Sequence, residues 1–502
     1  MAYYSPVDFL QDEEFIEGMK RRQNGELSLT WMDAATERVR CSPQSPRRGM
    51  TYKDINVGSY STDAIPEVIR SHRTMAPRGS ALPLGLPDMG YLVNRKSEVW
   101  ANNILALYEE SKTRQWNAST DIDWCALPDC QITDDMEKAF CQLCTLLTEV
   151  EMIATDLPAK WIPLINHDMI ELKSLLCMQA VDEARHTEVF RKRALANGVG
   201  LLQASVVAEH ALKGILDADT YTQASVFLHL LGEGFILSTF RNGEAIAPTA
   251  VDKKIFRLVM QDEARHVSYG MMHLKYFLRA HPSRAEEIHF MLDEAETLMI
   301  GLLGSAELAE PLIILAGKGF GREHIERGVE LTLFNQLTPS HARLSRTVAD
   351  MDFPSKEFFD RLRTELVGAA DEFARLGVFD ASFAIRVQAS PGFAEERNYL
   401  FRFELDSCTE LTETETDGLE DRVDFVLEAP HAIWCEMLAS RQPNGEIDAA
   451  HTINTLCHFD DPIRVRYRDP LGHDKLFRFQ QSVQTVFNVA ATVAAEGARA
   501  ST

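Results

Sequence analysis

The pentapeptide Asp-Glu-Ala-Arg-His occurs twice in this sequence, ending at His186 and at His266. In each copy the glutamate and the histidine are three residues apart, and this spacing puts both side chains on one face of a helix. Carboxylate and imidazole groups that share a helix face are suitable metal ligands. The two copies therefore predict two equivalent carboxylate–imidazole pairs, Glu183 with His186 and Glu263 with His266.

A lone glutamate precedes each pair. Glu149, in Leu-Leu-Thr-Glu, lies 183 − 149 = 34 residues before Glu183, and Glu233, in Leu-Leu-Gly-Glu, lies 263 − 233 = 30 residues before Glu263. The copies are offset by 84 and 80 residues, which indicates internal duplication of a helix pair. One helix, a turn and a returning helix bring each lone glutamate level with its pair. Glu151 is the alternative to Glu149, but only Glu149 shares the repeated Leu-Leu-x-Glu context.

Two lone glutamates and two Glu-x-x-His pairs form the inward-facing ligand set of a carboxylate-bridged di-metal centre in a four-helix bundle. Four carboxylates neutralise two divalent ions, and the mixed oxygen and nitrogen donors favour iron or manganese over zinc. The alternative is a pair of acidic, salt-bridged helices without metal, which would leave buried charge without compensation. The predicted ligands are Glu149, Glu183, His186, Glu233, Glu263 and His266.

The residues beside the predicted ligands also repeat. Asp182 and Asp262 each precede a ligand glutamate, and Arg185 and Arg265 each precede a ligand histidine. We expect each aspartate to accept a hydrogen bond from the imidazole of the other copy, which would fix the orientation of that ring. The arginines can balance the excess carboxylate charge. The alternative for all four residues is an ordinary salt bridge between neighbouring helices.

This twice-repeated pattern resembles the ferritin-like di-iron carboxylate superfamily over residues 133–300, and most of all its arylamine N-oxygenase and rubrerythrin-like subgroup. The resemblance implies two iron ions, with manganese able to occupy one site, O₂ as the oxidant, and a separate electron-donor protein. One position departs from the pattern. The N-oxygenases carry a further histidine ligand where this chain has Val259, and Gln179 occupies the corresponding place in the first copy. His229, one turn before Glu233, could reach the metals instead, although such a histidine is more often a hydrogen-bonded core residue.

The resemblance implies an O₂-dependent, monooxygenase-like, non-haem di-iron oxidoreductase that oxidises a small organic substrate. Hydroxylation, N-oxygenation, epoxidation and desaturation all stay open, and the departure at Val259 weakens the case for N-oxygenation. A rubrerythrin-like protein that handles peroxide or iron is one alternative, although such chains are short. The other is a radical-generating subunit like the small subunit of ribonucleotide reductase, which needs a buried tyrosine near the iron. Tyr269, on the ligand face, could relay an electron, although a packing role fits it better.

Three stretches of different composition must position these residues. Residues 1–94 predict an irregular N-terminal arm with one short amphipathic helix. Residues 95–377 show long helical periodicity and predict a mainly α, ferritin-like bundle with extra helices. Residues 378–502 alternate apolar and polar side chains and predict a separate α+β domain, in which the stretch 423–434 weakly resembles sterol-carrier-like domains. The acidic run 410–424 predicts a solvated loop. The long helices are expected at 133–157, 163–196, 220–242 and 250–281.

Acidic residues outnumber basic ones by 75 to 51, so the net charge of the 502 residues is 51 − 75 = −24. A nucleic-acid binder needs a basic footprint and an anionic membrane surface repels an acidic chain, so neither is an expected partner. No apolar run approaches about 18 residues, the acidic first residues do not predict an export signal, and the few cysteines fit reduced thiols. We therefore expect a cytoplasmic protein that binds a small-molecule substrate and is compatible with a homodimer.

Overall fold

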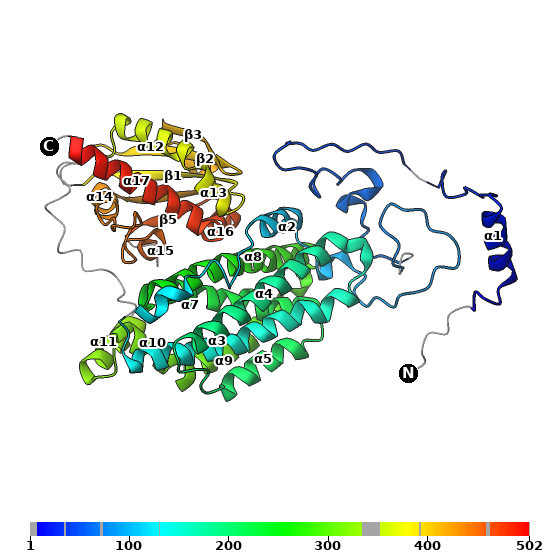
Figure 1. Cartoon of the computed structure of the whole chain (residues 1–502), viewed down its shortest axis with the longest axis horizontal. Helices are drawn as coiled ribbons and strands as arrows, with labels where there is room; N and C mark the ends of the chain where they lie inside the picture. Colours follow the sequence, from blue (N-terminus) through cyan, green and yellow to red (C-terminus); the bar gives the residue numbers. More distant parts are fainter. Residues whose placement is uncertain are drawn as a thin grey trace.

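The computed structural model describes residues 8–34, 37–70, 74–129, 131–333, 352–390, 393–457 and 462–500. Figure 1 shows an extended N-terminal arm, a bundle of long helices, and a C-terminal unit in which strands and helices combine. The chain is mainly helical with one five-stranded sheet, which confirms the predicted fold class.

The N-terminal arm carries helix α1 (Glu13–Gln23), which begins after Asp12 because that side chain accepts a hydrogen bond from the Phe15 amide at 2.9 Å. None of its residues is buried, and Figure 1 shows α1 away from the bundle. Farther along the arm, Arg48 forms an ion pair with Asp380 of the C-terminal unit at 2.6 Å. The arm is held at several further points along its length, because Tyr52 hydrogen-bonds Ser174 at 3.1 Å and Arg78 forms an ion pair with Glu171.

Long helices form the core of the bundle, and shorter helices cover it. Their bounds are α2 (Ile104–Thr113), α3 (Asp134–Trp161), α4 (Ile170–Ala196), α5 (Val206–Asp217), α6 (Tyr221–Ser225), α7 (Glu233–Ile246), α8 (Ala250–Ala280), α9 (Ala285–Leu303), α10 (Ala306–Gly317) and α11 (Arg322–Leu333). Helix α3 packs along α4, α7 packs along α8, and α4 contacts α8. Two helix hairpins thus face one another, as the internal duplication predicts.

A buried ion-pair network fixes the relative position of three of these helices. Arg193 of α4 lies 2.6 Å from Glu137 of α3 and 2.5 Å from Asp252 of α8. All three side chains are buried, so each charge depends on the others for compensation. The network therefore ties α3, α4 and α8 together at one end of the bundle.

The helix predicted over 220–242 is divided in the structure by a π-helical turn, Val226–Gly232, between α6 and α7. A π-helical turn contains one more residue than an α-helical turn, and it rotates the residues that follow. Gly270 of α8 makes room for this wide turn, because a Cβ atom there would lie 2.3 Å from the Cβ of His229. The turn therefore rests directly on the backbone of α8.

The C-terminal unit contains a sheet with strand order β3-β2-β1-β4-β5. Its elements are α12 (Lys356–Gly368), α13 (Ala370–Arg375), β1 (Ala381–Gln388), β2 (Arg397–Glu404), β3 (Ser407–Thr414), β4 (Phe425–Pro430), α14 (His431–Ala439), α15 (Ile453–Leu456), β5 (Arg464–Arg466), α16 (Pro470–Arg478) and α17 (Gln480–Ala500). Strands β1 and β4 are parallel, and the other neighbours are antiparallel. Helices α12 and α14 pack against α17, and together with the sheet they enclose a second core.

The acidic run predicted as a loop is partly a strand, so that prediction is wrong for residues 410–414. They belong to β3, where Leu411 is buried and pairs with Phe401 of β2. An edge strand needs an apolar side chain only on its inner face, and charged residues on its outer face discourage further pairing. The glutamates of this run therefore suit the edge of the sheet.

The C-terminal unit packs against the bundle mainly through α16, which lies along α8. Arg478 of α16 forms a buried ion pair with Glu110 of α2. Nearby, Asn454 of α15 donates a hydrogen bond to Glu244 of α7 at 2.7 Å. Buried polar contacts of this kind fix the docking geometry, because any displacement would leave charged groups unpaired.

In the described part of the chain, no single helix is both long and apolar enough to cross a membrane. One pair, Pro282–Leu303 with Ala306–Gly317, meets the length and composition test only when the two helices are taken together, and it is bent by 57°.

Gly270→Ala should destabilise the protein, because the new methyl group would collide with His229 and push the π-helical turn away from α8. We expect a loss of about 1–3 kcal/mol, the usual cost of overpacking a core. Gly234→Ala is the matched control, since a Cβ at Gly234 in α7 has nothing within 4 Å and alanine favours the helix. Thermal unfolding should show a lower Tm for the first variant only; equal Tm values would contradict this packing.

Candidate metal centre

Six acidic and histidine side chains converge in the middle of the bundle, and none is more than 5% exposed. Their oxygen and nitrogen atoms form two groups, each with all its donor atoms within 4.8 Å of one another. Glu183 and Glu263 belong to both groups and lie between them. The first group is completed by Glu151 and His186, and the second by Glu233 and His266.

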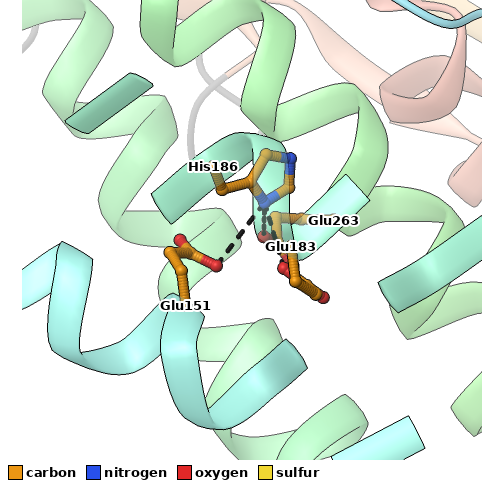
Figure 2. Close-up of side chains that lie close together, drawn as sticks. All are labelled: Glu151, Glu183, His186 and Glu263. Atoms are coloured by element: carbon orange, nitrogen blue, oxygen red, sulfur yellow. Dashed lines mark hydrogen bonds and ion pairs between the residues drawn. The ribbon is translucent and has the colours of Figure 1, made fainter. Parts of the chain in front are cut away.

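His186 holds the centre of the first group, as Figure 2 shows. Its Nδ1 atom lies 3.0 Å from Glu183, 3.1 Å from Glu263 and 3.5 Å from Glu151. The three carboxylates come from α4, α8 and α3. One imidazole nitrogen thus faces oxygen atoms from three different helices.

His266 occupies the equivalent position in the second group. Its Nδ1 atom lies 2.9 Å from Glu183, 3.5 Å from Glu263 and 3.6 Å from Glu233. Glu233 is the first residue of α7, immediately after the π-helical turn. The two halves of the site are therefore related in the same way as the two halves of the sequence.

The outer nitrogen of each imidazole faces the aspartate of the other copy. His186 Nε2 lies 3.1 Å from Asp262, and His266 Nε2 lies 3.4 Å from Asp182. Donation from Nε2 to a carboxylate leaves the Nδ1 lone pair directed at the glutamates, which is the tautomer that a metal ligand requires. The crossed arrangement is the one that the sequence predicts.

Arg185 and Arg265 connect the two aspartates. Arg185 contacts Asp182 at 2.5 Å and Asp262 at 2.7 Å, and Arg265 contacts both aspartates as well. Two positive and two negative charges thus cancel in this outer layer. The four residues therefore form salt bridges between helices, and the same salt bridges hold in place the aspartates that orient the imidazoles.

Glu149 was a wrong choice of ligand, and Glu151 takes its place. Glu149 lies outside both groups and accepts a hydrogen bond from the Ser205 amide at 3.4 Å, on the side of α3 that faces α5. Two residues correspond to about 200° around a helix, so both glutamates cannot face the same core. The repeated Leu-Leu-x-Glu context was misleading, because its second copy overlaps the π-helical turn and its first copy is regular α-helix.

His229 belongs to neither group, and it supports Glu233 from a distance. Gln179 donates to Glu233 at 3.1 Å, and the Gln179 carbonyl oxygen lies 3.2 Å from His229 Nε2. On its other side, His229 Nδ1 lies 2.8 Å from the Ser225 hydroxyl. Burial lowers the pKa of His229 to about 3, so the ring is neutral. The structure places it as a hydrogen-bonded core residue.

Trp116 is a contributor whose contact with the site was not predicted from the sequence. Its indole Nε1 donates to Asp262 at 2.7 Å, and its ring stacks near His186 with 6.4 Å between centroids. Gln115 donates to Asp182 at 3.1 Å. Both residues follow α2, about 70 positions before the first pentapeptide, and only the tertiary fold brings them to the aspartates.

The pKa values of the clustered side chains show that, without metal, protons must balance the buried negative charge. Burial raises the pKa of Glu151 and of Glu233 well above the usual range. Burial alone would lower the pKa of His186, but its contacts with Asp262 and the glutamates outweigh burial and raise that pKa well above the usual range. A divalent ion would replace these protons, so binding should become tighter as the pH rises.

The orphaned atoms of the cluster fit two metal ions. One oxygen of each glutamate and the Nδ1 atom of His266, which faces those glutamates, are buried without a hydrogen-bond partner. When all four carboxylates are ionised they would carry a charge of −4, which two divalent ions would cancel, whereas the outer layer is already neutral. Buried polar atoms without partners are costly, and metal coordination would satisfy them. The donor set suits iron and manganese.

An apolar pocket reaches the cluster, and neither Asp182 nor Asp262 lines it. Its volume is about 50 Å³, and residues of α3, α5, α7, α8, α9 and the π-helical turn line it. Most of the lining is aliphatic or aromatic, for example Ala154, Phe227 and Met299. The charged side chains in this lining are Glu151, Glu233 and Glu263 of the cluster.

No protein-family model and no curated protein matches this chain. Among solved structures, it is similar to two tyrosine-to-phenylalanine mutants of R2-like ligand-binding oxidases with an anaerobically reconstituted Mn/Fe cofactor. One is 19% identical over 42% of this chain and 82% of that chain, with a TM-score of 0.36. The other is 19% identical over 47% and 92%, with a TM-score of 0.38. Sterol carrier protein 2 is 19% identical over 28% and 98%, with a TM-score of 0.22.

At these identities and TM-scores, the fold and the site are assigned from the helices and side chains themselves. The paired hairpins, the two Glu-x-x-His motifs and the shared Glu183 and Glu263 match the ferritin-like di-metal arrangement expected from the sequence.

Glu151→Ala should lose at least one metal ion per chain, because it removes a carboxylate from the first group. Glu149→Ala is the matched control on the same helix and should keep the full metal content. Elemental analysis of both purified variants measures the difference. Loss of metal from the Glu149 variant alone would show that the ligand assignment is wrong.

Asp262→Asn should weaken metal binding without removing a ligand, because the amide is a poorer acceptor for His186. Loss of such an orienting partner typically costs about 10–100-fold in metal affinity. Competition with a chromophoric chelator measures this affinity. An unchanged affinity would mean that Asp262 does not orient the ring.

Proposed function

We propose that this protein binds two metal ions, two irons or iron with manganese in one position, and uses O₂ to oxidise a small apolar substrate. The observation that carries the proposal is the apolar pocket whose charged lining consists of Glu151, Glu233 and Glu263. A substrate in this pocket would contact the metal-facing carboxylates and otherwise only side chains that exclude water.

The protein's own residues would hold and shield the centre. Once reduced, the bound ions would supply redox chemistry and open coordination positions for O₂. Asp182 and Asp262 hold the imidazoles, and Gln179 holds Glu233 by a hydrogen bond at 3.1 Å. Glu151 and Glu233 are free of any arginine partner in the described part of the chain, which would let them shift as ligands are exchanged.

The lining of the pocket favours some reactions over others. Aliphatic and aromatic side chains would bind a hydrocarbon or aryl group, which suits hydroxylation, epoxidation or desaturation. N-oxygenation of a polar amine would bury an amino group among Leu228, Leu231 and Ile236 with no polar partner but the glutamates. We therefore place oxidation at carbon ahead of oxidation at nitrogen. Electrons would come from a separate donor protein.

A radical-generating role is the second candidate, and a buried tyrosine favours it. Tyr269 is 2% exposed, and its ring packs against His229 with 5.3 Å between centroids. Its hydroxyl, however, donates to the Val99 carbonyl at 2.8 Å, so it points to the backbone rather than to the cluster. Electron paramagnetic resonance of the protein after reaction with O₂ would reveal a persistent tyrosyl signal if this role were correct.

The oxygenase proposal is tested by loading the full chain with iron, reducing it, and mixing it with O₂ and a panel of apolar compounds. Ala154→Leu should fill the pocket and abolish product formation while metal content stays unchanged. Met152→Leu is the control, because Met152 lies on the same helix and is 56% exposed. Mass spectrometry should detect an oxidised product with wild type and the control.

Two results would contradict the proposal. Rapid consumption of hydrogen peroxide without oxidation of any organic compound would favour a peroxide-handling protein. Equal product yields from the Ala154 variant and the wild type would show that the substrate binds elsewhere.

A further inference from the structure

A polar cleft lies beside the contact between the bundle and the C-terminal unit, on the other face of α8 from the apolar pocket. It consists of two adjoining cavities of about 380 Å³ and 400 Å³. Helix α8 contributes one stripe at helical spacing to the first cavity: Lys254, Leu258, Gln261 and Arg265. Glu263 faces the apolar pocket on the opposite side of this helix. A ligand in the cleft would thus be distinct from a substrate at the metal centre.

Arg114 is a buried cation in this cleft that makes no direct ion pair within the described part of the chain. It is 6% exposed, and it donates to the Val378 carbonyl at 3.0 Å, to Gln261 Oε1 at 2.6 Å and to the Ser482 hydroxyl at 3.4 Å. None of these acceptors is charged. Its Nε atom is buried without a hydrogen-bond partner. Burial lowers the pKa of Arg114 to about 10, and the nearby Glu110 and Asp262 offset that effect only in part.

Two further donors line the cleft without an acceptor. Gln481 of α17 is 9% exposed, and its Nε2 atom is buried without a partner. Lys254 lines both cavities and makes no hydrogen bond or ion pair in the described part of the chain. Burial lowers the pKa of Lys254 as well. These donors come from both sides of the domain boundary, so one bound group could satisfy them together.

The carboxylates that line the cleft form no ion pair with Arg114 or Lys254 in the described part of the chain, although Glu446 and Asp121 attract Lys254 from a longer distance. Asp121 and Glu372 are exposed, and Asp121 accepts a hydrogen bond from the Asn117 amide at 2.7 Å. Glu446, in the second cavity, lies 3.9 Å from Arg257. A buried cation without a partner is unfavourable by several kcal/mol, and a bound anion would remove that cost. The buried part of the cleft lining therefore has more positive charge and more hydrogen-bond donors than its own acceptors satisfy.

We propose that this cleft is a binding site for a small oxyanion, a carboxylate or phosphate group, held by Arg114, Lys254 and Gln481 between the two parts of the protein. The guanidinium and ammonium groups would form charge-assisted hydrogen bonds with it. Its binding would stabilise the docking of the C-terminal unit beside Trp116 and Arg265, which also line the cavity. The proposal does not depend on the reaction at the metal centre.

Isothermal titration calorimetry of the full chain with inorganic phosphate, and separately with acetate, tests the site. Wild type should bind one anion per chain, and Lys254→Met should weaken binding roughly tenfold, as expected for loss of one charge-assisted hydrogen bond. Lys253→Met is the matched control. Lys253 is the neighbour of Lys254 on α8, and its substitution removes the same charge, but Lys253 does not line the cleft. Gln481→Leu provides a second, uncharged test of the same site.

Tighter binding of phosphate would indicate a phosphate group as the natural ligand, and equal binding of acetate would indicate a carboxylate. Absence of saturable binding for both anions would overturn the proposal. So would equal affinities of wild type, Lys254→Met and Gln481→Leu. A matching loss in Lys253→Met would also overturn it, because it would show an effect of net charge rather than of the cleft.

Discussion

The central constraint on this structure is the burial of four carboxylates at one point of a helical bundle. Glu151, Glu183, Glu233 and Glu263 are brought together, and among the described residues only two imidazoles join them as basic groups. Carboxylates in such surroundings must be protonated or bound to cations. The arginines that could have neutralised them are instead held by the aspartates one layer out. The inner layer is therefore left for metal ions, and the outer layer keeps the imidazoles in place.

Helix α8 connects the cluster to the rest of the molecule, because its different faces contact different parts of the structure. One face supplies Glu263 and His266 to the cluster. Gly270, one turn farther on, allows the π-helical turn to pack closely, and that turn sets the orientation of Glu233. The opposite face supports α16 of the C-terminal unit and lines the polar cleft. A change at the domain boundary could therefore reach the centre through Arg265, which lines the cleft and contacts both aspartates.

The two openings on either side of the cluster have opposite chemistry. The narrow opening is lined by aliphatic and aromatic side chains and ends at the carboxylates. The wide one is lined by cations, amides and exposed carboxylates, and its lining includes Trp116 and Arg265. Apolar walls strengthen electrostatic interactions near the cluster by excluding water, whereas a polar cleft can exchange charged groups with solvent. Under the two proposals above, an apolar substrate would bind in the narrow pocket and a small oxyanion would bind in the wide cleft.

The sequence by itself determined the bundle, both Glu-x-x-His pairs, Glu233 and the crossed aspartates, because these depend on helical spacing and on an internal repeat. Helical spacing is local, so it can be counted along the chain. The choice between Glu149 and Glu151 was decided only by the tertiary structure, because a π-helical turn in one copy breaks the register that the repeat implies. The contacts of Trp116 and Arg114 were likewise decided by the fold. Their partners lie more than a hundred residues away, and such pairings follow from packing rather than from any pattern in the sequence.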